Sequence, residues 1–105
     1  MTFSYTVDTP AGVRTGTTYL GPGNIQIVSG TWDNTAAGAN TNGTIVTGLS
    51  FVMAYKTTVH NGTVTSEHTS KKNVDGSGTA QLGSIGILVI PGSETQNGNW
   101  FAIGY

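Results

Sequence analysis

The sequence predicts an all-β fold: a single antiparallel β-sandwich or barrel-like domain. Short runs in which apolar and polar residues alternate are separated by Gly, Pro and Asn, and no stretch has helical periodicity over three turns. At 105 residues the chain has the length of one domain. We expect residues 1–23 to form an N-terminal arm or edge strands, and residues 24–105 to form the core of the sandwich.

The first part of the chain is expected to contain strands of different lengths. Alternation in Thr2–Val7 predicts a short strand or an extended arm, and the Thr-rich segment Val13–Leu20 predicts an edge strand. The segment Asn24–Asp33 predicts a longer strand. Small polar residues without periodicity predict a loop at Asn34–Gly43, and the β-branched segment Thr44–Thr47 predicts a short strand.

The strongest local signal predicts a central hairpin at Leu49–Ser70. Alternate residues from Leu49 to Val59, Met53 among them, are mostly apolar or aromatic, which predicts a strand with one buried face. The dipeptide Asn61-Gly62 follows and favours a two-residue turn, because both turn positions need φ > 0. Folding back about this turn would pair Val59 with Val64, Lys56 with Glu67, and Tyr55 with His68.

The segments after the hairpin predict a loop, a buried strand, a turn and a last strand. Polar residues predict a loop at Ser70–Gly83. The continuous apolar run Ile85–Ile90 predicts a strand buried on both faces, and Pro91-Gly92 ends it. Ser93–Asn99 is expected to be a turn region, and Trp100–Tyr105 to be a strand.

Alternation also assigns the two faces of the longer strands. In the first of them, Val28 and Trp32 share one face with Gly30 between them, and Ile25 and Ile27 share the other. A glycine at this position indicates a bulge or a close approach of another group. In the last strand, one face carries Trp100, Ala102 and Gly104, and the other carries Phe101, Ile103 and Tyr105.

Composition excludes several classes of function. Charged residues make up 9% of the chain against a typical share of about 25%, and the net charge is −1, so no charge pattern favours nucleic acid or an anionic membrane. The chain has no cysteine and therefore no disulfide or thiolate chemistry. Its first residues lack a basic segment followed by an apolar run, so we expect no signal peptide and no transmembrane segment. A surface-type composition without an export signal is typical of virion proteins.

No group of residues predicts catalysis, a metal site or a cofactor. His60 and His68 are expected to be solvent-exposed on opposite faces of the hairpin, with Glu67 as the one nearby carboxylate, whereas zinc needs three or four converging ligands. The segment Asp75–Gly78 lacks the alternating acids of a calcium loop and predicts a turn. No two of the carboxylates form a close pair in sequence: Asp8, Asp33, Glu67, Asp75 and Glu94.

The aromatic residues have two interpretations. A stacking platform for sugars would need exposed rings, and above all an exposed Trp32 or Trp100. The alternative, which we favour, is that these rings fill the core and interfaces of a small sandwich. The residues concerned are Trp32, Trp100, Tyr19, Tyr55 and Tyr105.

Three motifs carry a resemblance to a known class. They are a Gly-x-Trp strand in Val28–Trp32, a Thr-Gly-Leu entry into the central strand in Thr44–Leu49, and the ending Gly98–Tyr105. In these motifs the chain resembles small all-β proteins of tailed bacteriophages. The resemblance covers most of Asn24–Tyr105 and transfers no active site. It implies a non-enzymatic virion structural protein, and in particular a capsid decoration, or cement, protein.

This resemblance implies partners and a location. The chain would bind the outer surface of the major capsid protein lattice on the virion, and would associate with itself in a symmetric oligomer such as a trimer. We expect contacts through an N-terminal arm and through the loops Asn34–Gly43 and Ser70–Gly83. The alternatives are a tail or head–tail connector component, and a carbohydrate-binding or host-adhesion module. The predicted interface residues are Phe3, Tyr5, Val7, Trp32, Lys71 and Lys72.

Overall fold

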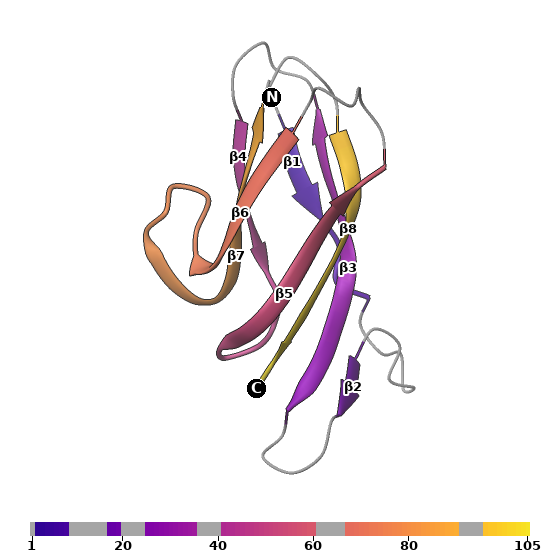
Figure 1. Ribbon diagram of the computed structural model, residues 1–105, viewed down its shortest axis with the longest axis vertical. Helices are drawn as coiled ribbons and strands as arrows, with labels where there is room; N and C mark the ends of the chain where they lie inside the picture. The colour runs from indigo at the N-terminus through magenta and orange to yellow at the C-terminus, as the bar shows by residue number, and fades with distance from the viewer. Residues whose placement is uncertain (1, 9–16, 20–24, 36–40, 61–66, 91–95) are drawn as a thin grey trace.

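Two antiparallel β-sheets pack face to face in this protein, which confirms the predicted all-β sandwich (Figure 1). The computed structural model describes residues 2–8, 17–19, 25–35, 41–60, 67–90 and 96–105. The described residues contain eight strands and no helix. The molecule extends over 44 × 27 × 21 Å.

The larger sheet has five strands. Its middle is formed by β3 (Gln26–Thr35) and β8 (Gln96–Gly104), and β5 (Val52–Val59) lies on the far side of β8. The N-terminal strands β1 (Thr2–Tyr5) and β2 (Thr17–Tyr19) both pair with β3 along its other edge. The N-terminal segment thus belongs to the larger sheet.

The smaller sheet has three strands in the order β4 (Thr41–Val46), β7 (Ala80–Ile90) and β6 (Glu67–Val74). Its central strand contains the apolar run Ile85–Ile90. Ile85 and its alternate neighbours are buried against the larger sheet, and on the other face the main-chain oxygen of Asp75 lies where a side chain at Gly86 would project. The predicted strand and its buried inner face are confirmed, but the outer face is only partly covered, because Leu88 is half-buried.

The predicted hairpin at Leu49–Ser70 is wrong, although both of its strands exist. β5 pairs with β8, with Tyr55 opposite Ala102, whereas β6 pairs with β7, with His68 opposite Val89. The two strands therefore lie in different sheets, and residues 61–66, including the expected turn, are outside the described residues. Alternation along a strand reports its faces but not its partner, because pairing depends on which distant strand buries more apolar surface.

A bulge reverses the expected faces at the start of β5. The pairing with β8 shifts register between Val52 and Ala54. Val52 is therefore fully buried, whereas Met53, which we placed on the core face, is 41% exposed. Beyond the bulge the expected phase is restored, with Thr57 buried and Thr58 exposed. A bulge adds one residue to one strand of a pair, and so it changes which face each preceding residue occupies.

Three predicted connections contain strand residues in their described parts. Asn34 and Thr35 belong to β3, and residues 41–43 belong to β4. The expected loop Ser70–Gly83 reduces to a turn between β6 and β7, because polar residues are tolerated in a strand at the edge of a sheet. The first four residues of β8 were likewise expected in a turn: Gln96, Asn97, Gly98 and Asn99.

The core lies between the two sheets, and its apolar side chains are accompanied by the buried polar side chains of Asn34, Thr47, Thr57, Ser84 and Gln96. The predicted faces of the two long central strands are confirmed, since β3 and β8 turn their tryptophans inward. Phe3, Val7 and Tyr55 pack around the margin of the core. The buried cluster consists of Val28, Trp32, Ile45, Leu49, Val52, Ile85, Ile87, Val89, Trp100 and Ala102.

Gly-x-Trp occurs twice in the middle of the larger sheet, once in β3 and once in β8. The two strands are antiparallel, and their register places Gly30 opposite Trp100 and Trp32 opposite Gly98. Each tryptophan therefore has a glycine as its direct neighbour on the adjacent strand. The two tripeptides are related by a local twofold arrangement.

The indole of Trp32 uses its glycine neighbour to reach across the sheet. Its Nε1 donates a hydrogen bond of 3.0 Å to the carbonyl oxygen of Thr58 on β5, two strands away. That same oxygen occupies the space that a Cβ atom at Gly98 would need. The missing side chain thus allows a buried indole both to pack and to satisfy its N–H group.

The second tryptophan has the same arrangement in the opposite direction. Trp100 Nε1 donates a hydrogen bond of 3.0 Å to the carbonyl oxygen of Thr6, beside the other edge of the sheet. This oxygen lies where a Cβ atom at Gly30 would project, so the close approach that the glycine suggested in the sequence is confirmed. The two indoles together connect β5, β8, β3 and the segment after β1.

Asn73 joins the two sheets at the start of β5. Its side-chain oxygen accepts hydrogen bonds from the main-chain N–H groups of Val52 (3.0 Å) and Gly83 (3.1 Å), and its nitrogen donates to the carbonyl oxygen of Val52 (2.9 Å). The residue has φ of 59°, in the left-handed region that asparagine tolerates better than most residues. One side chain therefore serves three main-chain groups beside the register shift in β6.

We predict that Gly98→Ala destabilises the fold by about 3 kcal/mol, because the added Cβ overlaps the Thr58 carbonyl and displaces the acceptor of the Trp32 indole. Urea unfolding followed by tryptophan fluorescence measures this loss. Gly48→Ala is the matched control: no atom lies within 4 Å of its Cβ position, but its φ of 90° makes alanine cost about 1 kcal/mol. A Gly98→Ala protein as stable as Gly48→Ala contradicts the proposed packing.

We also predict that Asn73→Gly lowers the free energy of unfolding by about 2 kcal/mol, because it leaves main-chain groups of Val52 and Gly83 without their partner. Glycine accepts the positive φ without steric cost, so the loss reports the hydrogen bonds. Native-state hydrogen exchange should show lower protection at the Val52 and Gly83 amides. Unchanged protection at both amides excludes this role for Asn73.

Candidate functional site

The N-terminal residues predicted as a contact arm lie against their own chain. Phe3 is half-buried and stacks on Trp32, with ring centroids 6.2 Å apart and an interplanar angle of 18°. Val7 also packs on the core, while Tyr5 is exposed. The main-chain N–H of Thr6 donates to the carbonyl oxygen of Thr31 at 2.8 Å, which extends the pairing beyond β1.

A platform of exposed tryptophans for sugars does not form. Trp32 is 1% exposed and Trp100 is 2% exposed, so neither ring offers a surface to a ligand or a partner. Trp32 was also predicted as an interface residue, and its burial shows that this prediction is wrong. Tyr55 is half-buried and only Tyr105 of the described rings in this set is well exposed; the side chain of Tyr19 is outside the description.

The lysine pair does not form a charged loop tip. Lys71 and Lys72 lie within β6, opposite Gly86 and Ile85, so their side chains start on opposite faces of the strand. Lys72 Nζ donates a 2.6 Å hydrogen bond to the carbonyl oxygen of Met53 on the facing sheet. The predicted interface residues are therefore distributed between the core, the edge and both faces, and they form no common surface.

The edge strands β5 and β6 face each other and are joined by side chains rather than by a backbone ladder. Tyr55 Oη and Ser70 Oγ are 3.0 Å apart, Ser70 Oγ and Thr57 Oγ1 are 3.1 Å apart, and Thr57 Oγ1 and His68 Nε2 are 2.8 Å apart. We call this chain of four residues the polar seam. It borders an open hollow of about 350 Å³ along one long side of the sandwich.

His68 is not the exposed histidine that the sequence suggested. Its ring lies against Trp32, with centroids 5.3 Å apart, and is half-buried between the sheets, whereas His60 is exposed. Burial lowers the pKa of His68 below its usual 6.5; a hydrogen bond with the main chain of Thr57 raises the pKa, and the charge of Lys56 lowers it. Because the strands lie in different sheets, the alternation within one hairpin could not locate this ring.

The described residues contain no cluster of three or more His, Asp or Glu side chains that could hold a metal ion. Asp75, the acid of the calcium-like sequence, instead organises a turn. Its Oδ1 accepts hydrogen bonds of 2.9 Å from the main-chain N–H groups of Ser77 and Thr79. This Asx-type turn explains why aspartate is followed by small residues.

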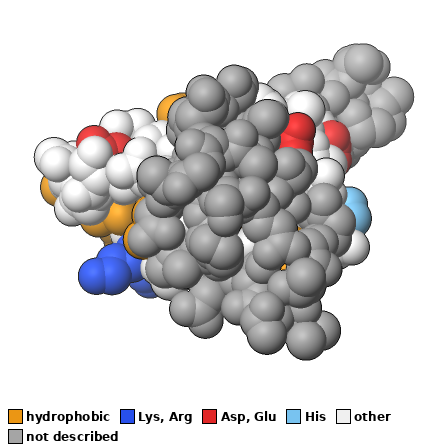
Figure 2. Space-filling model, turned by 90° about the horizontal axis from the view of Figure 1, so that it is seen from above, with side chains coloured by type: hydrophobic (Ala, Val, Ile, Leu, Met, Phe, Trp, Pro, Cys, Tyr) orange, Lys and Arg blue, Asp and Glu red, His pale blue; other side chains and the backbone are white. Residues whose placement is uncertain are grey.

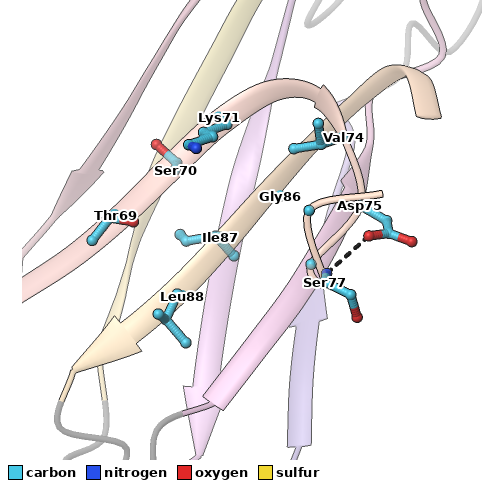
Figure 3. A pocket seen from close by; sticks show the side chains of 11 residues that line it. Thr69, Ser70, Lys71, Val74, Asp75, Ser77, Gly86, Ile87 and Leu88 are labelled. Carbon is cyan, nitrogen blue, oxygen red and sulfur yellow. Dashed lines mark hydrogen bonds between the residues drawn. The ribbon is translucent and has the colours of Figure 1, made fainter. Parts of the chain in front are cut away.

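A hollow of about 190 Å³ lies between this turn and the outer face of the smaller sheet (Figure 3). Figure 3 shows Lys71 and Leu88 on its sheet side and Asp75 and Ser77 on its turn side. The main-chain N–H groups of residues 76–78 are already bonded within the protein. Lys71 is therefore the one cationic group of this hollow, and no array of donors surrounds it that would hold an anion.

Main-chain hydrogen bonds join the β4–β5 connection to Gly83 of β7 and to the C-terminal Tyr105, and several residues in and beside these segments are apolar and exposed. Leu82 is 67% exposed, and the rings of Phe51 and Tyr105 pack together with centroids 5.7 Å apart. Asn73 binds the neighbours of Met53 and Leu82 and so holds these two residues near each other. We define the apolar end as Val46, Phe51, Met53, Leu82 and Tyr105.

Sequence reasoning did not find the apolar end. Phe51 and Met53 were assigned to the core face, and Leu82 lies in the segment Ser70–Gly83 that was expected to be a polar loop. A single leucine in a polar stretch is a weak signal, because isolated exposed apolar residues are normal. Only the fold brings together the segments that carry these residues.

Charged side chains are few in this protein, at 9% of the sequence. In the end-on view of Figure 2, the described atoms are mainly white, and the blue, red and pale-blue areas are small and separate. A surface of this kind does not steer charged partners over long distances. Recognition by the described surface would therefore depend on shape, apolar contact and neutral hydrogen bonds.

No protein-family model, no curated protein and no solved structure matches this chain. Within the described residues, no helix has the length and apolar character needed to cross a membrane.

We predict that stability falls as the pH is lowered from about 7.5 to about 5, because the unfolded chain binds a proton at His68 more readily than the folded chain does. Because the pKa of His68 is lowered in the folded state, its full contribution to stability is present above pH 6.5, the usual pKa of histidine, and declines at lower pH. Urea unfolding at both pH values measures the effect. His68→Gln should reduce the pH dependence of stability, and His60→Gln should not. If the two variants have equal effects, His68 is not the source of the pH dependence.

Proposed function

We propose that this chain is a non-enzymatic structural protein of a bacteriophage virion: a capsid decoration protein that binds the outer surface of the major capsid protein lattice and stabilises the shell. The apolar end is the observation that carries the proposal. The three motifs that resemble small phage proteins supply its biological setting. The all-β sandwich and the nearly neutral composition agree with a protein that works by contact.

The apolar end suits attachment to a preformed protein surface. Grouped and exposed apolar side chains mark protein contact sites more often than scattered ones do. Aromatic residues and methionine are enriched at the centres of such contacts, and this group contains Phe51, Tyr105 and Met53. The main chain beneath the two rings is fixed, because Tyr105 and Phe51 exchange hydrogen bonds of 3.0 Å and 3.2 Å.

Self-association would strengthen a contact of this size. Five residues of one chain form a small patch, and small patches bind weakly. Several copies in a symmetric oligomer, such as a trimer on a threefold position of the shell, would engage the lattice together and raise the effective affinity. The proposal therefore includes a homo-oligomer and a location on the virion surface.

The proposal predicts that the protein sediments with isolated virions or empty capsids of the source phage and saturates at a copy number related to capsid symmetry. Leu82→Ser and Tyr105→Ser should each weaken binding about tenfold, since both remove apolar contact area. Val59→Ser is the matched control, because Val59 is an exposed apolar residue outside the apolar end.

Two results would count against the proposal. Absence of saturable binding to shells, with binding to tails instead, would indicate a tail or connector component. Equal loss of binding in the Val59→Ser control would show that the apolar end is not the contact. Size-exclusion chromatography with light scattering measures the oligomeric state independently.

A further inference from the structure

A second hollow, of about 210 Å³, lies on the outer face of the larger sheet. The exposed ring of Phe101 forms one wall, and polar side chains of Asp8, Ser29, Thr58 and Asn99 surround it. These residues come from four segments of the chain, and the fold brings them together. None of them belongs to the apolar end or to the polar seam.

Strand register explains how the hollow forms. Ser29 on β3 lies opposite Phe101 on β8, and Thr58 on β5 lies opposite Asn99 on β8. The main-chain N–H of Asp8 donates a 2.9 Å hydrogen bond to the carbonyl oxygen of Ser29, which places the acid beside the same row. All five residues are on the outer face, because the intervening positions of β3 and β8 face the core.

The main chain of Gly30 and Trp100 forms the floor of the hollow. Both residues line it, but Trp100 directs its indole into the core, and Gly30 has no side chain. Main chain rather than a side chain therefore lies between Phe101 and the polar groups. A rigid sheet supports this area, so a ligand would meet groups that are already in place.

The polar groups around the hollow have unused hydrogen-bonding capacity. Among the described residues, the side chains of Asp8, Ser29 and Asn99 have no hydrogen-bond partner. Thr58 Oγ1 donates a 3.3 Å hydrogen bond to the carbonyl oxygen of Asn99 and retains acceptor capacity. A carboxylate, an amide and two hydroxyls together can accept from and donate to several hydroxyl groups of one ligand.

Phe101 supplies the apolar element of the hollow. Its ring is 42% exposed on the sheet face, so one side is available to a ligand. An aromatic ring favours contact with the C–H face of a saturated ring, while the surrounding polar groups bind its hydroxyls. The lining includes one carboxylate and no cationic side chain, which disfavours anions.

We propose that this hollow binds one ring of a neutral saccharide, with the ring stacked on Phe101 and its hydroxyls bonded to Asp8, Asn99 and Ser29. The site differs from a tryptophan platform, since both tryptophans are buried beneath it. It is also separate from the proposed capsid contact. A decoration protein attached through its apolar end would leave this face available to glycans.

Saturation-transfer NMR with a panel of neutral methyl hexopyranosides tests the proposal on the full chain. At least one member should bind with a millimolar dissociation constant, as expected for a single ring in a shallow site. Phe101→Ala and Asp8→Ala should each weaken binding about tenfold or more. The substituted side chains are exposed, and the fluorescence of the buried tryptophans verifies that each variant is folded.

Two matched variants serve as controls. Tyr105→Ala removes another exposed aromatic ring, and Asp33→Ala removes another exposed acid; both should bind the sugar as the original protein does. Absence of binding across the panel, or a loss caused by Tyr105→Ala but not by Phe101→Ala, overturns the proposal. Equal binding of glycerol also overturns the proposal, because it would show that the hollow does not select a saccharide ring over a small polyol. Capsid sedimentation of Phe101→Ala should be unchanged, so the two proposals fail independently.

Discussion

The reciprocal packing of Trp32 and Trp100 across β3 and β8 is the constraint on which the rest of the structure depends. Each indole lies beside a glycine of the neighbouring strand and reaches a main-chain carbonyl beyond it, at Thr58 and Thr6 respectively. Large side chains bury more apolar area than any other choice, but their N–H groups need partners. Pairing each with a glycine meets both requirements, and it fixes the positions of β5 and of the N-terminal segment.

The two long sides of the sandwich are closed by different chemistry. On one side Phe3 packs against Gly43, whose lack of a side chain makes room for the ring. On the other side the polar seam, Lys72 and Asn73 connect β6 to β5 through side chains alone. Side-chain hydrogen bonds contribute less than apolar packing and respond to pH through His68. The contact between the sheets along the polar seam is therefore weaker than the apolar contact on the other side, and it depends on pH.

The two proposed contact areas differ in their chemistry. The apolar end collects residues from four strand ends, whereas the hollow beside Phe101 combines one ring with neutral hydrogen-bonding groups on a flat sheet face. The Trp32 indole contributes to both areas, because its hydrogen bond to the Thr58 carbonyl oxygen holds β5 in place. A protein with few charges can thus present two distinct contact areas without long-range electrostatics.

The sequence by itself determined the all-β class, the inward faces of β3 and β8, and the existence of β7 as a strand with a buried face, because each is a local consequence of alternation or of a continuous apolar segment. Only the tertiary structure decided that β5 and β6 belong to different sheets, that a bulge exposes Met53, and that His68 lies against Trp32. The polar strand containing Lys71 was mistaken for a loop for the same reason. Strand partners and edge positions are set by competition among distant segments for apolar burial, and that competition leaves no mark in the local pattern.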